Sequence, residues 1–286
     1  MYFFFNGSFL SEHEAKLSIL DLGLIRGFGV FDYLRTYKGK PFHLKEHFQR
    51  LEYSAKNIGL SLPYSFDEME EILEKLIKQN GAGEFSLKLI VTGGISPDQL
   101  LPSGNTSFIA FAYPLTPYPS VHFTNGIKTI TTTHQRCLPD CKTTQYLPAI
   151  ISLQEGRKKG ALESLYLNEN QEILEATTSN FFAFKQGILI TPPEKGILLG
   201  ITREIVLRLC QDHFPIEVRA ISKKEIPHLD ETFITASNKE VMPVIQIDDH
   251  LIQQGEVGPL TKKVIELFST YTSSGNWEPL TIARYL

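Results

Sequence analysis

The stretch Phe181-Phe-Ala-Phe-Lys-Gln-Gly-Ile-Leu-Ile-Thr191 contains two short apolar runs on either side of the turn Lys185-Gln-Gly187. Two apolar runs joined by a short turn that contains glycine are typical of a β-hairpin. We therefore predict a pair of antiparallel strands here. Such signals outnumber credible strand–helix–strand units along the chain, which favours an α+β fold with long antiparallel sheets.

Helices and further strands are predicted on both sides of this hairpin. A helical period of apolar residues spans 44–58, and Ser65 with Glu68 forms a possible capping box for a second helix that ends at Asn80-Gly81. Further helices are predicted over 147–159, from Gly200 onward and over 259–271. The expected strands cover the first five residues and the ranges 30–37, 85–92, 127–133 and 164–168.

A proline-rich stretch, Tyr113-Pro-Leu-Thr-Pro-Tyr-Pro-Ser120, separates two parts of the chain. Proline fixes the backbone and removes amide donors, so this stretch is suited to an extended connection. We predict a small N-terminal α/β domain over 1–114 and an interdomain linker over 115–124. Residues 125–286 are expected to form a larger, mostly antiparallel β domain with helices.

Composition narrows the classes of partner. The 286 residues include 28 basic and 32 acidic side chains, a formal charge of −4, which excludes the basic field of a nucleic-acid-binding protein. No apolar run approaches the roughly 20 residues that span a bilayer, and the N-terminus lacks the basic region of a signal peptide. With three cysteines and no disulfide framework, we expect a cytoplasmic protein without membrane or nucleic-acid partners.

Two short motifs have simpler explanations than the functions they suggest. The stretch Gly27-Phe-Gly29 resembles the start of a dinucleotide fingerprint but opens a strand, so we expect its glycines to serve positive φ or close backbone approach. The pattern His43-Leu-Lys-Glu46-His47 matches that of inverted zinc peptidases. No convincing third ligand is evident, so we predict no metal site and keep a zinc metallopeptidase only as a remote alternative.

Several individually weak motifs together resemble one family. The chain is similar to the fold type IV, pyridoxal-phosphate-dependent class IV aminotransferases, which include branched-chain and D-amino-acid aminotransferases and aminodeoxychorismate lyase. The D-amino-acid-type branch is the most similar. The matching stretches, in order, are Arg26-Gly-Phe-Gly-Val-Phe-Asp-Tyr-Leu-Arg35, Glu46-His-Phe-Gln-Arg-Leu51, Lys142-Thr-Thr-Gln-Tyr146, Glu175-Ala-Thr-Thr-Ser-Asn-Phe-Phe182, Gly196-Ile-Leu-Leu-Gly-Ile-Thr-Arg203 and Thr235-Ala-Ser-Asn-Lys-Glu-Val241.

The resemblance implies a two-domain fold and pyridoxal 5′-phosphate as cofactor. It implies that Lys142 forms the Schiff base with the cofactor aldehyde and shuttles the proton, which requires a primary amine. Glu175 would face the pyridine nitrogen and keep it protonated. The residues that would hold the cofactor phosphate are Arg50, Ile201, Thr202, Ser237 and Asn238. Arg26 and Lys88, which stands where many relatives have arginine, would bind the substrate carboxylate.

The resemblance also implies the reaction. We expect a ping-pong aminotransferase that moves an amino group between an amino acid, of D-amino-acid or branched-chain type, and a 2-oxo acid. Because this fold completes its active site with a loop of a neighbouring subunit, a homodimer is expected. Aminodeoxychorismate lyase, which eliminates pyruvate, and a non-catalytic binding module remain alternatives.

Overall fold

The computed structural model describes residues 1–285, which divide into two compact units. Unit 1 contains Met1–Thr116, Cys141–Gln145 and the residues from Trp277 onward; unit 2 contains Pro117–Asp140 and Tyr146–Asn276. The boundary after Thr116 falls inside the expected linker. Residues 141–145 and 277–285, which lie in the range expected for the larger domain, belong to unit 1.

Unit 1 is built on a six-stranded sheet with the strand order β2-β1-β6-β5-β3-β4, in which each neighbouring pair is antiparallel. Its helices and strands are β1 (Tyr2–Phe5), β2 (Ser8–Ser11), α1 (Leu22–Ile25), β3 (Gly29–Tyr37), β4 (Lys40–Pro41), α2 (Leu44–Asn57), α3 (Phe66–Asn80), β5 (Phe85–Thr92), β6 (Ser107–Pro114) and a 3₁₀ helix at Ala283–Tyr285. The predicted helices and the strand over 85–92 are confirmed, whereas β6 was not predicted.

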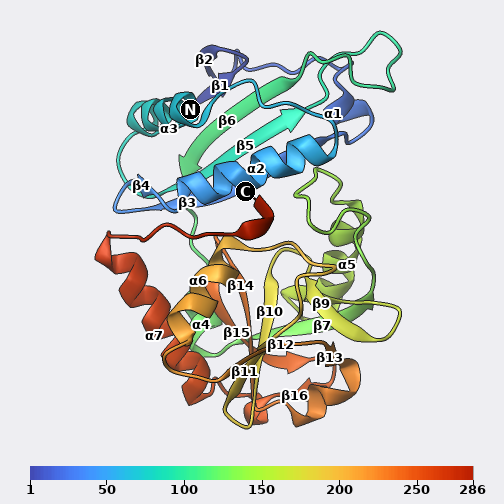
Figure 1. Ribbon diagram of the computed structural model, residues 1–286, viewed down its shortest axis with the longest axis vertical. Coiled ribbons are helices and arrows are strands. Elements are labelled where there is room, and N and C mark those ends of the chain that lie inside the picture. Colours follow the sequence, from blue (N-terminus) through green and yellow to red (C-terminus); the bar gives the residue numbers. More distant parts are fainter. Residues whose placement is uncertain (286) are drawn as a thin grey trace. The chain divides into compact units, whose positions relative to one another are not determined.

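The long helices of unit 1 lie along one face of this sheet (Figure 1). The predicted capping box is present: Ser65 N donates to Glu68 Oε2 at 2.8 Å, and Glu68 N donates to Ser65 Oγ at 3.4 Å. It satisfies two amides that a helix start leaves without partners. The apolar faces of α2 and α3 pack on alternate residues of the central strands, which form the core with Leu51, Leu73 and Leu87 at its centre.

The two glycines of the Gly27-Phe-Gly29 motif have the structural roles expected of them. Gly27 adopts a φ of +62°, a conformation that side chains disfavour. At Gly29 an added Cβ would lie only 2.7 Å from the carbonyl oxygen of Val91 on the neighbouring strand. Glycine is therefore required at Gly29 by the neighbouring backbone and favoured at Gly27 by its φ, and the motif leads into β3 rather than into a phosphate-binding helix.

Unit 2 contains a ten-stranded sheet with the order β12-β11-β10-β14-β15-β7-β8-β9-β13, and β16 pairs with β15. Its elements are α4 (Val121–Thr124), β7 (Ile127–Thr133), α5 (Leu147–Lys158), β8 (Glu163–Leu167), β9 (Glu172–Ala176), β10 (Asn180–Lys185), β11 (Ile188–Thr191), α6 (Ile201–Cys210), β12 (Ile216–Val218), β13 (Ile221–Ser222), a 3₁₀ helix at Lys223–His228, β14 (Glu231–Ala236), β15 (Glu240–Ile247), β16 (His250–Leu251), a 3₁₀ turn at Gln253–Gly255 and α7 (Pro259–Ser274).

The predicted hairpin is confirmed as β10 and β11, with Phe184 opposite Leu189. The sheet is more mixed than expected, because the pairs β7–β8, β7–β15 and β11–β12 are parallel. Its core is formed by buried side chains of the central strands, among them Phe181, Ile234 and Met242. The two sheets and their flanking helices confirm the α+β class.

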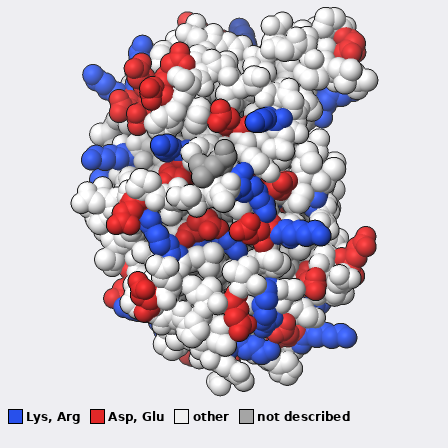
Figure 2. All heavy atoms as spheres, in the orientation of Figure 1, with Lys and Arg blue, Asp and Glu red and all other residues white. Residues whose placement is uncertain are grey.

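Charged side chains of both signs are interspersed over the face shown in Figure 2, in agreement with the small net charge. No helix within residues 1–285 combines the length and apolar character needed to cross a membrane.

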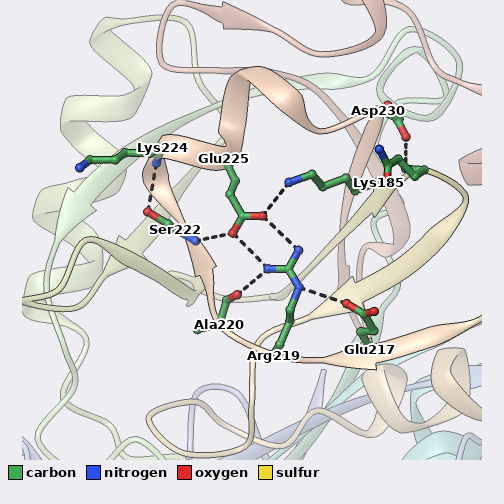
Figure 3. A network of polar contacts seen from close by, with 9 residues as sticks. Lys185, Glu217, Arg219, Ala220, Ser222, Lys224, Glu225 and Asp230 are labelled. Carbon is green, nitrogen blue, oxygen red and sulfur yellow. Dashed lines mark hydrogen bonds and ion pairs between the residues drawn. The ribbon is translucent and has the colours of Figure 1, made fainter.

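An ion-pair network stabilises the end of unit 2 that carries β12 and β13 (Figure 3). Arg219 donates from Nη1 and Nη2 to the two carboxylate oxygens of Glu225, each at 3.0 Å. Lys185 Nζ and the backbone amide of Ser222 donate to the same carboxylate at 3.0 and 3.1 Å. Partial burial by itself raises the pKa of Glu225, but these hydrogen bonds outweigh it and lower the pKa to about 2.

This network makes a pH-dependent contribution to stability. The carboxyl group of Glu225 has a lower pKa in the folded than in the unfolded chain, so its stabilisation is present above about pH 4.5 and is lost as the pH falls towards 2. We expect Glu225→Gln to lower the free energy of unfolding by about 1 kcal/mol at pH 7, and less as the pH falls below about 4.5. Urea unfolding at pH 7, 5, 4 and 3 measures this, with the exposed Glu169→Gln as control. If Glu225→Gln lowers the free energy of unfolding equally at pH 7 and pH 3, the pH-dependent role of this carboxylate is contradicted.

Candidate functional site

The backbone of Lys142 is fixed by pairing with the start of β3 in unit 1. Phe31 N donates to the carbonyl oxygen of Lys142 at 2.9 Å, and Thr144 N donates to that of Gly29 at 2.9 Å. On the other side, Lys142 N donates to Ser54 Oγ of α2 at 3.1 Å. Hydrogen bonds therefore hold the backbone of Lys142 on both sides, which limits the positions that its side-chain amine can occupy.

The side chains of Lys142 and Lys88 meet at one aromatic ring. Their Nζ atoms lie 4.7 and 4.9 Å from the centroid of Phe31. Both contacts are within the range of cation–π attraction. Burial lowers the pKa of Lys88 on β5. Two predicted site residues are thus brought together beside an apolar ring, where cationic groups favour an anionic ligand such as a carboxylate.

Arg50 of α2 forms a buried ion pair with Asp32 of β3. Its Nε donates to Asp32 Oδ2 and its Nη2 to Oδ1, both at 2.8 Å, while His47 Nδ1 lies 2.7 Å from Oδ1. Burial alone raises the pKa of Asp32, but Arg50 and His47 hold it well below its usual range. Burial lowers the pKa of His47. Two donors of the predicted phosphate-binding arginine are therefore used by Asp32.

The zinc-peptidase-like pattern has structural roles. His43 is the N-cap residue of α2 and has a φ of 52°, and its Nδ1 lies 3.2 Å from Glu46 Oε1. The same Glu46 oxygen accepts the amide of Leu280 at 2.7 Å and so holds the segment from Trp277 onward on α2. His47 contacts Asp32. In the part of the chain that the structure describes, no group of three or more potential ligands is arranged to hold a metal ion.

Arg26 is exposed on the loop that follows α1. Its Nε donates to the carbonyl oxygen of Gln99 at 3.1 Å. The neighbouring Asp98 accepts the amides of Leu100 and Leu101 at 2.9 and 3.0 Å, which gives this loop a defined turn. Of the two predicted substrate-binding residues, Lys88 is half-buried beside Phe31 and Arg26 is held by a loop backbone.

Glu175 lies near the end of β9 in unit 2, where it is only 5% exposed. Its Oε1 accepts from Nε and Nη2 of Arg136 at 2.9 and 2.7 Å, and its Oε2 accepts the amide of Leu198 at 3.1 Å. Charge-assisted bonds of this kind orient a carboxylate strongly. Arg136 was missed by the sequence analysis, because an isolated arginine in a loop carries no local signal of its partner.

The N-terminus of α6 is linked to Glu175 through hydrogen bonds. Asn180 Nδ2 donates to the carbonyl oxygen of Leu198 at 2.8 Å, whose amide binds Glu175. Gly200, the N-cap residue, has an extended backbone without a side-chain cap, and an added Cβ would lie 2.1 Å from Asn180 Oδ1. Glycine leaves room for the Asn180 side chain here, and the helix start that follows, with the buried Thr202, is suited to an anion.

The turn with Ser237 and Asn238 joins β14 to β15, and both side chains are partly exposed. Thr235 precedes it, opposite Asn180 on the adjacent strand. The Oγ1 atom of Thr235 is buried and lacks a hydrogen-bond partner among residues 1–285. A buried hydroxyl without a partner is costly unless a ligand or water satisfies it.

Unit 2 therefore combines two kinds of recognition. Glu175 provides a buried carboxylate, which a protonated ring nitrogen would require, and the α6 start and the 237–238 turn provide amides, hydroxyls and an amide side chain, which a phosphate would require. This donor and acceptor set fits pyridoxal 5′-phosphate, which carries both groups.

Comparisons with known proteins, by sequence and by structure, both match this chain to aminotransferases. The model of the family described as "Amino-transferase class IV" matches residues 29–247. The chain is 34% identical to the "Putative branched-chain-amino-acid aminotransferase" of Methanocaldococcus jannaschii, over 94% of this chain and 95% of that protein. It is 31% identical to the D-alanine aminotransferase of Staphylococcus epidermidis, over 95% and 98%.

The fold is also that of solved aminotransferases. The structure matches the branched-chain amino acid aminotransferase from Escherichia coli at a TM-score of 0.88 and 26% identity, covering 98% of this chain and 97% of that one. A second branched-chain aminotransferase, solved with pyridoxamine 5′-phosphate, matches at a TM-score of 0.89 and 26% identity, covering 96% and 95%. The resemblance and the two-domain fold inferred from the sequence are confirmed.

The buried group around Asp32 yields a stability prediction. Asp32→Asn leaves the Arg50 guanidinium buried without its counter-ion, so we expect the free energy of unfolding to fall by about 3 kcal/mol. Urea unfolding followed by circular dichroism measures it. The exposed Asp249→Asn serves as control and should differ from the wild type by less than about 0.5 kcal/mol. Equal stability of the two variants would show that the Asp32–Arg50 pair adds nothing to the fold.

Proposed function

Since the chain belongs to the class IV aminotransferase family, we propose that Lys142 is the residue that binds its cofactor covalently. The protein is an aminotransferase that depends on pyridoxal 5′-phosphate and moves an amino group from an amino acid to a 2-oxo acid. The observation that carries the residue assignment is the family match over 29–247, a range that includes each residue proposed to hold the cofactor.

We propose that the cofactor is bound through its ring nitrogen, its aldehyde and its phosphate by different residues. Glu175, held by Arg136 and the Leu198 amide, accepts the hydrogen bond of the protonated ring nitrogen. The phosphate is bound by the amides of Ile201 and Thr202, the Thr202 hydroxyl, Ser237, Asn238 and Arg50. Arg50 contributes only donors not used by Asp32, so its role is narrower than the two-donor fork expected from the sequence.

When bound, pyridoxal 5′-phosphate supplies an electron sink that allows a bond at the amino acid α-carbon to break. With the cofactor bound, Lys142 Nζ would serve as the general base that takes up and returns the proton moved in the reaction. The amine must be uncharged to do so, and a desolvated site next to another cation favours the uncharged form. Glu175 meanwhile keeps the ring nitrogen protonated.

For the substrate, we propose an amino acid of D-amino-acid or branched-chain type whose carboxylate is bound by Lys88, with Arg26 as the second candidate. Relatives of both names match the chain at 34% and 31% identity, and they support both substrate classes. Lysine offers a point charge where arginine would offer a planar fork, so carboxylate orientation at Lys88 depends on additional donors.

The alternatives have less support. The curated relatives described above are named aminotransferases, so pyruvate elimination by a lyase has no specific observation in its favour. A zinc peptidase is not supported, because His43 contacts Glu46 and His47 contacts Asp32.

We further propose a cytoplasmic homodimer. The exposed Leu147, Ile150 and Ile151 lie one turn apart on α5 and form an apolar stripe that a second subunit would cover. The three free cysteines, two of them buried, are compatible with a reducing compartment.

The covalent role of Lys142 has a spectroscopic test. The purified wild type should absorb at about 410–430 nm and give a borohydride-stable adduct, because only a primary amine binds the cofactor aldehyde reversibly. Lys142→Ala should lose both signals, while the exposed Lys159→Ala should keep them. Mass spectrometry of the reduced protein locates the adduct, and its presence on another lysine would refute the assignment.

The substrate assignment is tested by single half-reactions. L- and D-amino acids are added separately to the wild type, and the loss of the 410–430 nm band, about the range expected of the bound cofactor, identifies the donors. We expect Lys88→Met to raise KM for the accepted donor by about tenfold with a smaller change in kcat, because a charged contact to the carboxylate is lost. Lys40→Met, which removes an exposed charge, is the control. An unchanged KM would exclude Lys88 from substrate binding.

A further inference from the structure

A second buried ion pair in unit 2 has no role in the function proposed above. Glu163 begins β8 and Lys239 ends the turn between β14 and β15, and their Oε1 and Nζ atoms are 2.9 Å apart. Their side chains are 1% and 3% exposed. Burial opposes charge on both, but Lys239 lowers the pKa of Glu163 and Glu163 raises the pKa of Lys239, so both are charged at neutral pH.

The Glu163 carboxylate also binds the turn that follows β9. The hydroxyls of Thr177 and Thr178 donate to its two oxygens, and Ser179 Oγ donates at 3.4 Å. Lys239 Nζ donates to Thr178 Oγ1 at 2.6 Å, which closes the network between the two turns. The pair therefore connects two segments that are about 60 residues apart in the chain, 177–179 and 237–239.

Each of these segments adjoins a residue assigned to the cofactor. Glu175 precedes Thr177 by two positions, and Ser237 and Asn238 immediately precede Lys239. A buried ion pair contributes little to stability compared with apolar residues, and its best-attested use is to fix one arrangement. The Lys239 ammonium contacts Glu163, Thr178 and the ring of Tyr118, whose centroid is 5.6 Å from Nζ, so its described partners are groups of the protein rather than a phosphate.

We infer that Glu163 and Lys239 are positioning residues, which hold the phosphate-binding turn 237–238 in register with the turn behind Glu175. This inference rests on the proposed assignment of Ser237 and Asn238 to the cofactor phosphate. Its consequence is specific: loss of the pair should weaken recognition of the phosphate group more than recognition of the pyridine ring.

The test compares binding of pyridoxal 5′-phosphate with binding of pyridoxal, which lacks the phosphate. The variant is the double substitution Glu163→Gln/Lys239→Met, which removes both charges and leaves neither buried alone. Dissociation constants of the apoproteins for both ligands are measured by absorbance titration, and far-UV circular dichroism checks the fold. Lys185→Met/Glu225→Gln, which removes an ion pair of the network in Figure 3, is the matched control.

We expect the double variant to lose affinity for pyridoxal 5′-phosphate about tenfold and for pyridoxal less than about twofold, since one or two oriented hydrogen bonds to the phosphate are lost. The control should bind both ligands as the wild type does, and Lys239→Arg should retain most of the preference for the phosphate. Equal loss for both ligands, or no loss for either, overturns the inference.

Two further outcomes distinguish a failure of this inference from a failure of the proposed phosphate site. A wild type without preference for the phosphorylated ligand overturns both, because the phosphate site itself would be wrong. A wild type with the preference and a double variant that keeps it overturns the positioning role alone. Should the double variant not fold, Thr178→Val removes the hydroxyl that links Lys239 to the 177–179 turn. It should reduce the preference about threefold, and an unchanged preference contradicts the inference.

Discussion

The backbone pairing between the start of β3 and the segment around Lys142 is the interaction on which the chemistry depends. The hydrogen bonds from Phe31 N and from Thr144 N fix the backbone of Lys142, the lysine proposed to bind the cofactor, against β3 of unit 1. Gly29 also lies close to β5, where an added Cβ would be 2.7 Å from the carbonyl oxygen of Val91. The start of β3 therefore holds the backbone of a lysine that lies more than one hundred residues later in the chain.

Three buried carboxylates are organised in the same way. Asp32, Glu163 and Glu175 each lie less than one tenth exposed and each faces a cation, from Arg50, Lys239 and Arg136 respectively. Buried ions of this kind are tolerated only when they are paired and hydrogen-bonded. Each of the three pairs includes or adjoins a residue proposed to hold the cofactor, namely Arg50, Glu175 or Asn238, which is consistent with a role of buried charge in orientation.

Much of the fold was predictable because its signals are local. The capping box at Ser65, the hairpin at Lys185–Gly187 and the alternating strand over 85–92 are determined by neighbouring residues, and the structure confirms each. The strands β6 and β14 were missed; each pairs on one side with a strand distant in sequence, β6 with β1 and β14 with β10. Motifs in the sequence suggest Lys142 and Glu175 as cofactor residues, but they do not reveal Arg136 or the Glu163–Lys239 pair, whose partners are separated by 39 and 76 positions.

The composition of unit 1 from three separate segments has a consequence for synthesis on the ribosome. The nascent chain releases residues 1–116 first, but the strand-like segment at 141–145 and the segment that binds Glu46 belong to the same unit. The last of these follows residues 146–276 in the chain, so it leaves the exit tunnel after all of unit 2. The first unit to emerge is therefore the last to be completed. The sheet and helices within residues 1–116 are synthesised before the segment that contacts Glu46, which lies more than two hundred residues later in the chain.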